Sequence, residues 1–272
     1  MDLFFSIVSV LFGLVLGSFF NVLIYRLPRH ESIVRPGSHC PNCSRPVRPW
    51  ENIPLASFAF LRGKCAGCGW KIPLRYPLVE AATGAAALVL YICVVAPAAK
   101  TGLTPVIAAT LALQVIILLL MIPIAIIDFS HLIIPEAITV PGILLAVLVS
   151  FLPGGITPLQ CGLGILVGGG FLYGAGFIGR LAFRKKETMG FGDVELLALA
   201  GAAFGWKIAF MTILFGTLAG LVGAFVMVLR GKLAKSHIMP FGPYLGLGLW
   251  VAALAGDPIV TFYFSIFDRL LR

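Results

Sequence analysis

The stretch VIAATLALQVIILLLMIPIAII, residues 106–127, runs without a charged side chain directly into Asp128. An apolar run of about 18 or more residues is long enough to cross a bilayer as a helix. A carboxylate is costly inside hydrocarbon, so an acid at the end of such a run points to the membrane edge and to a functional role. This stretch therefore predicts a membrane helix that ends on an acid.

Similar apolar runs recur along the whole chain and determine the fold class. They lie at 3–24, 80–98, 138–152, 161–179 and 208–229. Hydrophobic residues make up 60% of the sequence and charged residues only 11%, whereas soluble domains carry about 25% charged residues. The sequence therefore predicts an all-α polytopic membrane protein.

The net charge of +9 comes mainly from three clusters of basic residues. Nine lysines and arginines lie in 25–79, four in 180–186 and three in 230–235. Basic loops stay on the cytoplasmic side of a membrane, so we expect these three segments to share that side. Orientation in a lipid bilayer thus explains the charge, and no nucleic-acid partner is expected.

Counting crossings between these basic segments predicts about eight transmembrane helices, with the N-terminus outside. The count requires a short crossing at 193–205 and a last span at about 242–266. It places both Asp128 and Asp193 at the cytoplasmic edge of the membrane. We expect a first transmembrane helix at 1–24, a small cytoplasmic loop domain at 25–79 and a transmembrane core at 80–272.

The loop at 25–79 carries two CxxC pairs, CPNC at 40–43 and CAGC at 65–68, with 21 residues between them. Four thiolates at such spacing converge tetrahedrally on one Zn²⁺ and leave no open position for a water. A cytoplasmic loop is kept reduced, which disfavours a disulfide pair, and a redox CxxC would need a thioredoxin-like pattern. We predict a structural zinc site held by Cys40, Cys43, Cys65 and Cys68.

The stretch GFGD at 190–193 opens a further apolar segment with a second acid at the same predicted depth as Asp128. Two carboxyl groups that meet in a low dielectric resist simultaneous ionisation, so one can take a proton from water while the other donates a proton to a carbonyl. Gly190 and Gly192 would let an extended substrate strand come close. Glu195 should point to another helix face.

Two other interpretations of the acids stay open at this point. Either aspartate alone could be a helix cap or an interfacial loop residue. A pair of intramembrane acids could also bind protons or sodium in a transporter. The residues by themselves favour neither protease nor transporter.

Several sequence blocks resemble those of the type IV prepilin peptidases, which are membrane aspartyl proteases with a GxGD signature. The blocks are GSFFNVLIYRLP (17–28), HCPNC (39–43), PWENIPLASFAFLRGKCAGC (49–68), KIPLRYPLVE (71–80), IDFSHLIIPE (127–136), GFGD (190–193) and PFGPYL (240–245). They cover nearly the whole chain in the family's order. The resemblance makes 80–272 an aspartyl protease core.

The resemblance implies two activities at the cytoplasmic face of a bacterial inner membrane. Asp128 and Asp193 would be the catalytic pair that cleaves the leader from prepilins or pseudopilins. The bifunctional members also methylate the new N-terminus with S-adenosylmethionine, and their four cysteines bind zinc and accompany methylation. The chain departs from the family in one place, because Glu195 stands where members commonly have lysine.

Two other functions are compatible with the sequence. One is a leader peptidase without methyltransferase activity, since no glycine-rich nucleotide motif is present. The other is an ion-coupled transporter with a zinc-stabilised loop. From loop context alone, we place the methyl donor near Glu51, Asn52 and the zinc loop.

Overall fold

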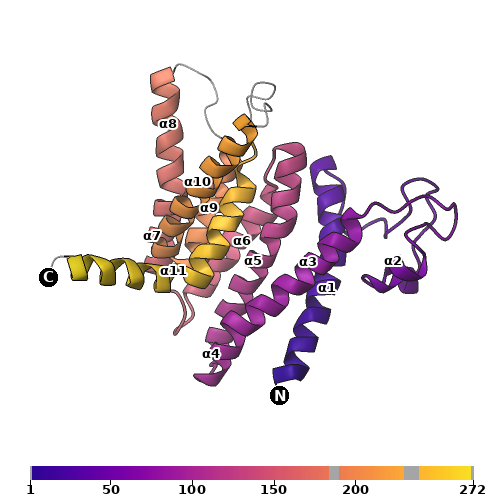
Figure 1. The fold of residues 1–272 in the computed structure, drawn as a ribbon, viewed down its shortest axis with the longest axis horizontal. Coiled ribbons are helices and arrows are strands. Elements are labelled where there is room, and N and C mark those ends of the chain that lie inside the picture. Colours follow the sequence, from indigo (N-terminus) through magenta and orange to yellow (C-terminus); the bar gives the residue numbers. More distant parts are fainter. Residues whose placement is uncertain (1, 184–189, 230–238, 271–272) are drawn as a thin grey trace. The chain divides into compact units, whose positions relative to one another are not determined.

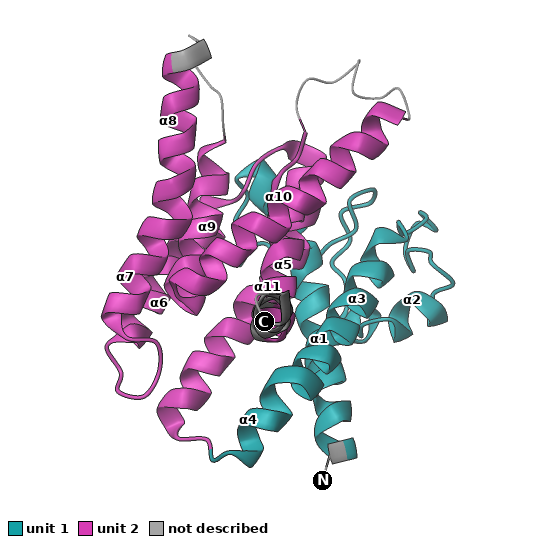
Figure 2. Cartoon of the chain, turned by 60° about the vertical axis from the view of Figure 1, so that its left-hand side comes forward, with its two compact units in different colours: residues 1–102 teal, residues 103–272 magenta. Residues whose placement is uncertain are grey.

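The computed structural model describes residues 2–183, 190–229 and 239–270, and within these ranges it is mostly helical (Figure 1). Regular strands are absent from the described residues, which pair in β fashion only at two isolated bridges. The chain forms two compact units, residues 1–102 and 103–272 (Figure 2). The basic segments predicted to be cytoplasmic at 184–186 and 230–235 lie outside the described residues.

The first unit consists of two long helices joined by an irregular loop segment. Its elements are α1 (Asp2–Arg26), η1 (Leu27–Arg29), η2 (Pro49–Asn52), α2 (Ala56–Phe60), α3 (Arg75–Leu90), a π-helical turn η3 (Tyr91–Val95) and α4 (Ala96–Lys100). Between residues 30 and 74 only the short η2 and α2 are helical. The rest of this segment is irregular, and its assignment as a separate loop domain at 25–79 stays a prediction.

Glycines let α1 pack closely along α3. A Cβ added at Gly13 would lie 2.7 Å from the Cβ of Ala87, and one at Gly17 would lie 2.7 Å from the Cα of Glu80. Small residues four apart allow two membrane helices to approach backbone to backbone, where dispersion contacts hold them. The GLVLG sequence of α1 therefore determines how closely α1 and α3 pack.

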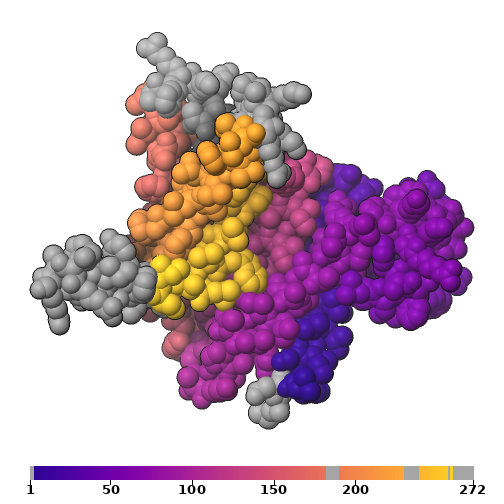
Figure 3. All heavy atoms as spheres, viewed as in Figure 1, coloured from indigo at the N-terminus to yellow at the C-terminus, as the bar shows by residue number. Residues whose placement is uncertain are grey.

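The second unit is a bundle of seven α-helices in its described part. They are α5 (Pro105–His131), α6 (Glu136–Ser150), α7 (Pro158–Ile165), α8 (Phe171–Phe183), α9 (Phe191–Phe204), α10 (Trp206–Leu229) and α11 (Gly242–Leu270), with a π-helical turn η4 (Leu166–Gly170) between α7 and α8. In Figure 3, α10 and the first part of α11 lie side by side on the surface. The bundle surrounds the short helix α9.

Helix α9 is the centre of this unit because its neighbours cover it on all sides. Every residue from 196 to 203 is buried. A Cβ at Gly201 would lie 2.0 Å from the carbonyl oxygen of Gly164, so the backbones of α9 and α7 touch directly. The Gln114 side chain of α5 donates to the carbonyl of Ala203 at 2.9 Å. These contacts hold α9, and with it Asp193, rigidly in the bundle.

Five helices in the described residues are long and apolar enough to cross a membrane. They are Leu3–Arg29, Arg75–Lys100, Pro105–His131, Pro158–Leu181 and Trp206–Leu229. Glu136–Ser150 and Gly242–Gly256 are shorter apolar helices. The predicted all-α, multi-pass membrane fold is confirmed at this level, and the count of eight spans stays a prediction.

Candidate functional site

Asp128 lies in the last turn of α5 and is buried, with 5% of its surface exposed. Its Oδ2 accepts a hydrogen bond from the backbone N–H of Gly242 at 2.8 Å. Gly242 is the first residue of α11, so the positive end of that helix faces the carboxylate. The chain leaves α5 at once, through Leu132 in a left-handed conformation with φ 57°.

Asp193 lies in the first turn of α9, directly after the GFG stretch. Its carboxyl group is close enough to Asp128 for the charge of one to act on the other. The two aspartates are 65 positions apart in the sequence and meet because α5 ends, and α9 begins, at the same end of the bundle. The structure thus brings together the pair that the topology predicts.

Ile134 packs against the starts of α9 and α11, beside the two aspartates. Its Cβ would lie 2.8 Å from a Cβ added at Gly192, and its Cδ1 would lie 3.3 Å from one added at Gly242. A side chain at position 192 would therefore collide with Ile134. Gly190 is exposed, and a Cβ there would lie 3.3 Å from Oδ2 of Asp193. Contact of either glycine with a substrate stays a prediction.

Glu195 forms its hydrogen bond away from the two aspartates. Its Oε2 accepts a hydrogen bond of 2.6 Å from the hydroxyl of Thr139, which is completely buried in α6. The Glu195 side chain is therefore engaged by α6 and ties α9 to that helix. His131, at the end of α5, is exposed.

Gly242 is a residue of this site to which the sequence analysis assigns no role. The sequence block PFGPYL at 240–245 contains it, but nothing in that block points to a partner 114 positions earlier. A glycine flanked by nearby prolines at a helix start can indicate that the backbone there approaches another group closely. A Cβ at this position would lie 2.8 Å from Oδ2 of Asp128.

The four cysteines of the first unit form a compact cluster. Their sulfur atoms all lie within 4.8 Å of one another, and the Sγ atoms of Cys40 and Cys68 are 3.9 Å apart. Tetrahedral coordination with Zn–S bonds of about 2.3 Å would separate the sulfurs by about 3.8 Å. The cluster therefore fits a single metal ion of the size and softness of Zn²⁺.

Two knuckles of matching geometry supply the cysteines. In the first, the N–H of Cys40 donates to the carbonyl of Arg45 and the N–H of Ser44 donates to the carbonyl of Cys40. In the second, Cys65 pairs in the same way with Trp70 and Gly69. Ser44 and Gly69 both have positive φ, 58° and 70°. The loop is thus built from one turn used twice.

Hydrogen bonds to two of the four sulfurs favour the thiolate form that binds metals, whereas the pKa of Cys43 is raised to about 11. The side chain of Asn42 donates to Sγ of Cys68 at 3.5 Å, which lowers the pKa of Cys68 to about 6. The backbone amides of Cys68 and Gly67 lower the pKa of Cys65. Thiolates are the metal-binding species of cysteine, so these two sulfurs are prepared for a cation.

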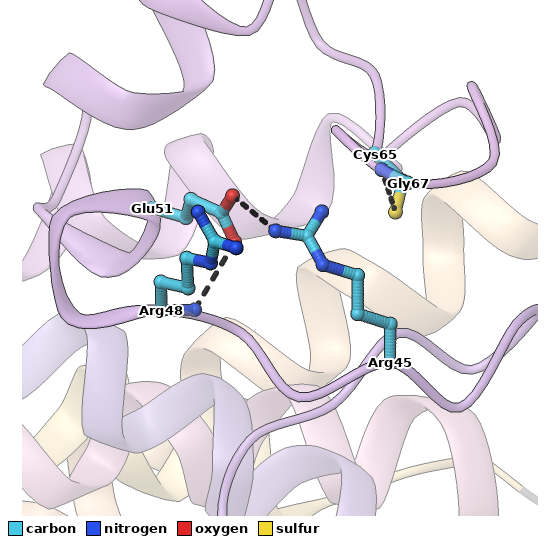
Figure 4. A network of polar contacts seen from close by, with 5 residues as sticks. All are labelled: Arg45, Arg48, Glu51, Cys65 and Gly67. Carbon is cyan, nitrogen blue, oxygen red and sulfur yellow. Dashed lines mark hydrogen bonds and ion pairs between the residues drawn. The ribbon is translucent and has the colours of Figure 1, made fainter.

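An ion pair connects the first knuckle to η2 (Figure 4). The guanidinium of Arg45 lies 2.9 Å from Oε1 of Glu51, and the backbone N–H of Arg48 donates to Oε2 at 3.1 Å. Together, the Arg48 amide and then the Arg45 guanidinium hold the pKa of Glu51 below its ordinary value. The position of η2 beside the cysteines therefore depends on an ionised Glu51.

Comparison with known proteins finds matches over both units. Residues 11–94 match the model of the bacterial peptidase A24 N-terminal domain, and residues 115–225 match that of the type IV leader peptidase family. No solved structure matches the chain.

Curated relatives span nearly the full chain and carry the same name in distant bacteria. A prepilin leader peptidase/N-methyltransferase of Pseudomonas putida is 33% identical over 94% of this chain and 92% of its own. The protein of that name from Bacillus subtilis (strain 168) is 35% identical over 94% of this chain and 96% of its own. Both matches extend across the cysteine loop and the two aspartates, so the chain belongs to the type IV leader peptidase family.

Proposed function

We propose that this protein removes the leader peptide of prepilins or pseudopilins and then methylates the N-terminus that the cleavage exposes. Relatives that match nearly its full length carry both activities in their name. The observation that carries the peptidase half is the meeting of Asp128 and Asp193 at the ends of α5 and α9. The transporter alternative is not favoured, because the family match covers both acids.

In the proposed cleavage the two aspartates share the work of acid and base. Asp128, which already accepts the N–H of Gly242, acts as the carboxylate, because a hydrogen bond to the charged form stabilises it. It takes a proton from a water molecule as the water oxygen attacks the scissile carbonyl carbon. Asp193 holds a proton and donates it to the carbonyl oxygen. The carbon–nitrogen bond then breaks as Asp128 passes its proton to the departing amine, and Asp193 recovers a proton from a hydroxyl of the tetrahedral intermediate, which leaves a carboxylic acid product.

The two carboxyl groups retain one shared proton because they repel each other when both are charged. Burial strengthens this repulsion, since water screens little inside the bundle. The rigid seat of α9 fixes the separation of the pair, which acid–base catalysis requires. The pair is proposed to lie at the cytoplasmic edge of a bacterial inner membrane, where a pilin leader would meet its apolar helix.

The methyltransferase half is proposed to depend on the first unit. S-Adenosylmethionine, when bound, supplies the methyl group, and the amine of the new N-terminus accepts it. The cysteine cluster is proposed to hold Zn²⁺ as a structural ion, because four thiolates leave no position for a water. The metal would then fix the two knuckles and the walls around them.

Co-expression with a prepilin followed by intact-mass measurement of the product tests both halves. Wild type should yield a leader-free pilin that carries one extra methyl group. Asp128→Asn and Asp193→Asn should each lower leader removal by at least about 100-fold. Glu195→Gln is the matched control, because it keeps an acceptor for Thr139 and lies outside the pair; its cleavage should stay near that of wild type.

The cysteine cluster is tested in the same experiment. Cys40→Ser should release a leader-free pilin that lacks the methyl group. Normal cleavage by either asparagine variant would refute the assignment of the pair. Leader removal without methylation in wild type would reduce the protein to a peptidase.

A further inference from the structure

A pocket of about 200 Å³ lies within the first unit, between the cysteine knuckles and the facing ends of α1 and α3. Cys40 and Cys65, the first cysteine of each knuckle, form part of its wall. Asn21 of α1 and Glu80 of α3 line it from the helix side. A metal ion at the cysteines would therefore fix one wall of the pocket directly.

One buried polar atom of this pocket lacks a hydrogen-bond partner, and one buried carboxylate lacks a cation. Asn21 is 3% exposed, and its Oδ1 has no hydrogen-bond partner among the described residues, although its Nδ2 donates to the carbonyls of Gly17 and Tyr76. Unpaired buried acceptors are rare because each one loses its hydrogen bonds to water without gaining another partner. The oxygen of Asn21 is thus free to accept a donor from a ligand.

Glu80 adds a carboxylate without a cation. It is 9% exposed, and its Oε2 accepts the N–H of Leu55 at 2.8 Å. Among the described residues, the one lysine or arginine ion pair joins Arg45 to Glu51, so Glu80 has no cationic partner there. Buried carboxylates are normally paired with a positive charge.

The one arginine of the pocket wall that is buried does not fill this role. Arg26 directs its guanidinium nitrogens to the carbonyls of Ser32, Pro36 and Gly37. Four aromatic residues, Tyr25, Phe58, Trp70 and Tyr76, also line the pocket. The pocket therefore offers acceptors, one uncompensated carboxylate and aromatic faces, which together suit a cationic ligand that has an aromatic ring and hydrogen-bond donors.

S-Adenosylmethionine has this chemistry, because it combines a sulfonium cation and an ammonium group with a purine and ribose hydroxyls. We propose that this pocket is the binding site for the methyl donor, with Asn21 and Glu80 as its polar contacts. The inference rests on the proposed methyltransferase function. It also explains how metal at the cysteines would serve methylation without taking part in it.

The test measures binding directly, by titrating the purified full-length protein with S-adenosylmethionine and with its product S-adenosylhomocysteine. Asn21→Leu removes the free acceptor at similar size, and Ser57→Phe fills the pocket from α2 without removing a buried group. Both should weaken binding at least tenfold. Thr83→Val is the matched control: it removes a buried hydroxyl of α3 that does not line the pocket, and it should change binding less than twofold.

Folding of each variant is checked by its metal content and its thermal unfolding. Photo-crosslinking of labelled donor to wild type needs no variant, and it should mark peptides that contain Tyr25, Trp70 or Tyr76. Wild-type affinity in both Asn21→Leu and Ser57→Phe, or crosslinks confined to the second unit at Trp206 or Trp250, would overturn the pocket.

The same preparation separates failure of the pocket from failure of the function. If wild type binds the donor and transfers methyl groups, and the pocket variants bind the donor equally well, the pocket assignment is refuted and the methyltransferase function stands. If wild type removes the leader but neither binds the donor nor methylates the product, both the methyltransferase function and the pocket assignment are refuted.

Discussion

The hydrogen bond from Gly242 to Asp128 shows how much of the site depends on one missing side chain. The start of α11 lies against the carboxylate only because residue 242 has no Cβ. That contact provides a fixed donor beside a group that has to carry charge, and it requires no reorganisation during the reaction. A single methyl group at this position therefore acts on the chemistry more than on the fold.

Gly242→Ala should lower leader removal by about 10- to 100-fold, because a displacement of about 1 Å at a catalytic group has effects of that size. The added Cβ would lie 2.8 Å from Oδ2 of Asp128, so the carboxylate has to move. Gly162→Ala is the control, since a Cβ there meets nothing within 4 Å. Rates of prepilin cleavage in membranes give the comparison, and equal rates for both variants would contradict the role of Gly242.

Among the elements, the cysteine loop shows what spacing predicts and what it leaves out. Two CxxC pairs predict a metal cluster, because ligand chemistry depends on residue type and local spacing, and the structure does bring Cys40, Cys43, Cys65 and Cys68 together. The link from Arg45 to Glu51 was not predicted, since a pairing of surface charges depends on how the loop folds back. Likewise, the contact of Glu195 with Thr139 requires the packing of α9 on α6.

The Glu51 contact should make the loop sensitive to acid. The folded-state pKa of Glu51 is lower than its ordinary value of about 4.3, so its stabilising contribution is complete above about that pH and is lost as the pH falls through the folded-state pKa. Glu51→Gln should therefore lower the stability of the loop at pH 7. The difference between variant and wild type should shrink as the pH falls through the folded-state pKa of Glu51.

Amide hydrogen exchange at 45–52 measures this effect locally, which avoids the contributions of other carboxyl groups. Glu136→Gln provides a control in the first turn of α6, in the other unit. A difference that persists unchanged at low pH would show that the Glu51 side chain acts by packing rather than by charge.

For the whole molecule, hydropathy predicts that helices cross a membrane and charge predicts which loops share a side. Counting the membrane crossings between the basic loops also predicts that Asp128 and Asp193 lie at the same depth. Hydropathy does not predict the number of crossings with the same certainty, because α9 is short and buried by protein rather than by lipid. The π-helical turns at Tyr91–Val95 and Leu166–Gly170 are equally invisible to it, since they leave the apolar pattern unchanged.

Reporter fusions along the chain test the count of eight spans. Fusions after positions 62, 134, 190 and 240 should report a cytoplasmic end, and those after 102, 155 and 205 an external one. Basic loops and alternating crossings require this pattern. A cytoplasmic signal at 205 would show that α9 does not cross on its own, and the count would fall below eight.

The backbone contact between Gly164 and Gly201 has a consequence for how the gene tolerates change. A Cβ at either position would lie 2.0 Å from the other helix's carbonyl oxygen, so every other amino acid collides there regardless of its polarity. In a saturation library selected for prepilin cleavage, these two codons should accept no replacement at all. Exposed apolar positions of α10 such as Leu221, which is 66% exposed, should accept almost any apolar residue.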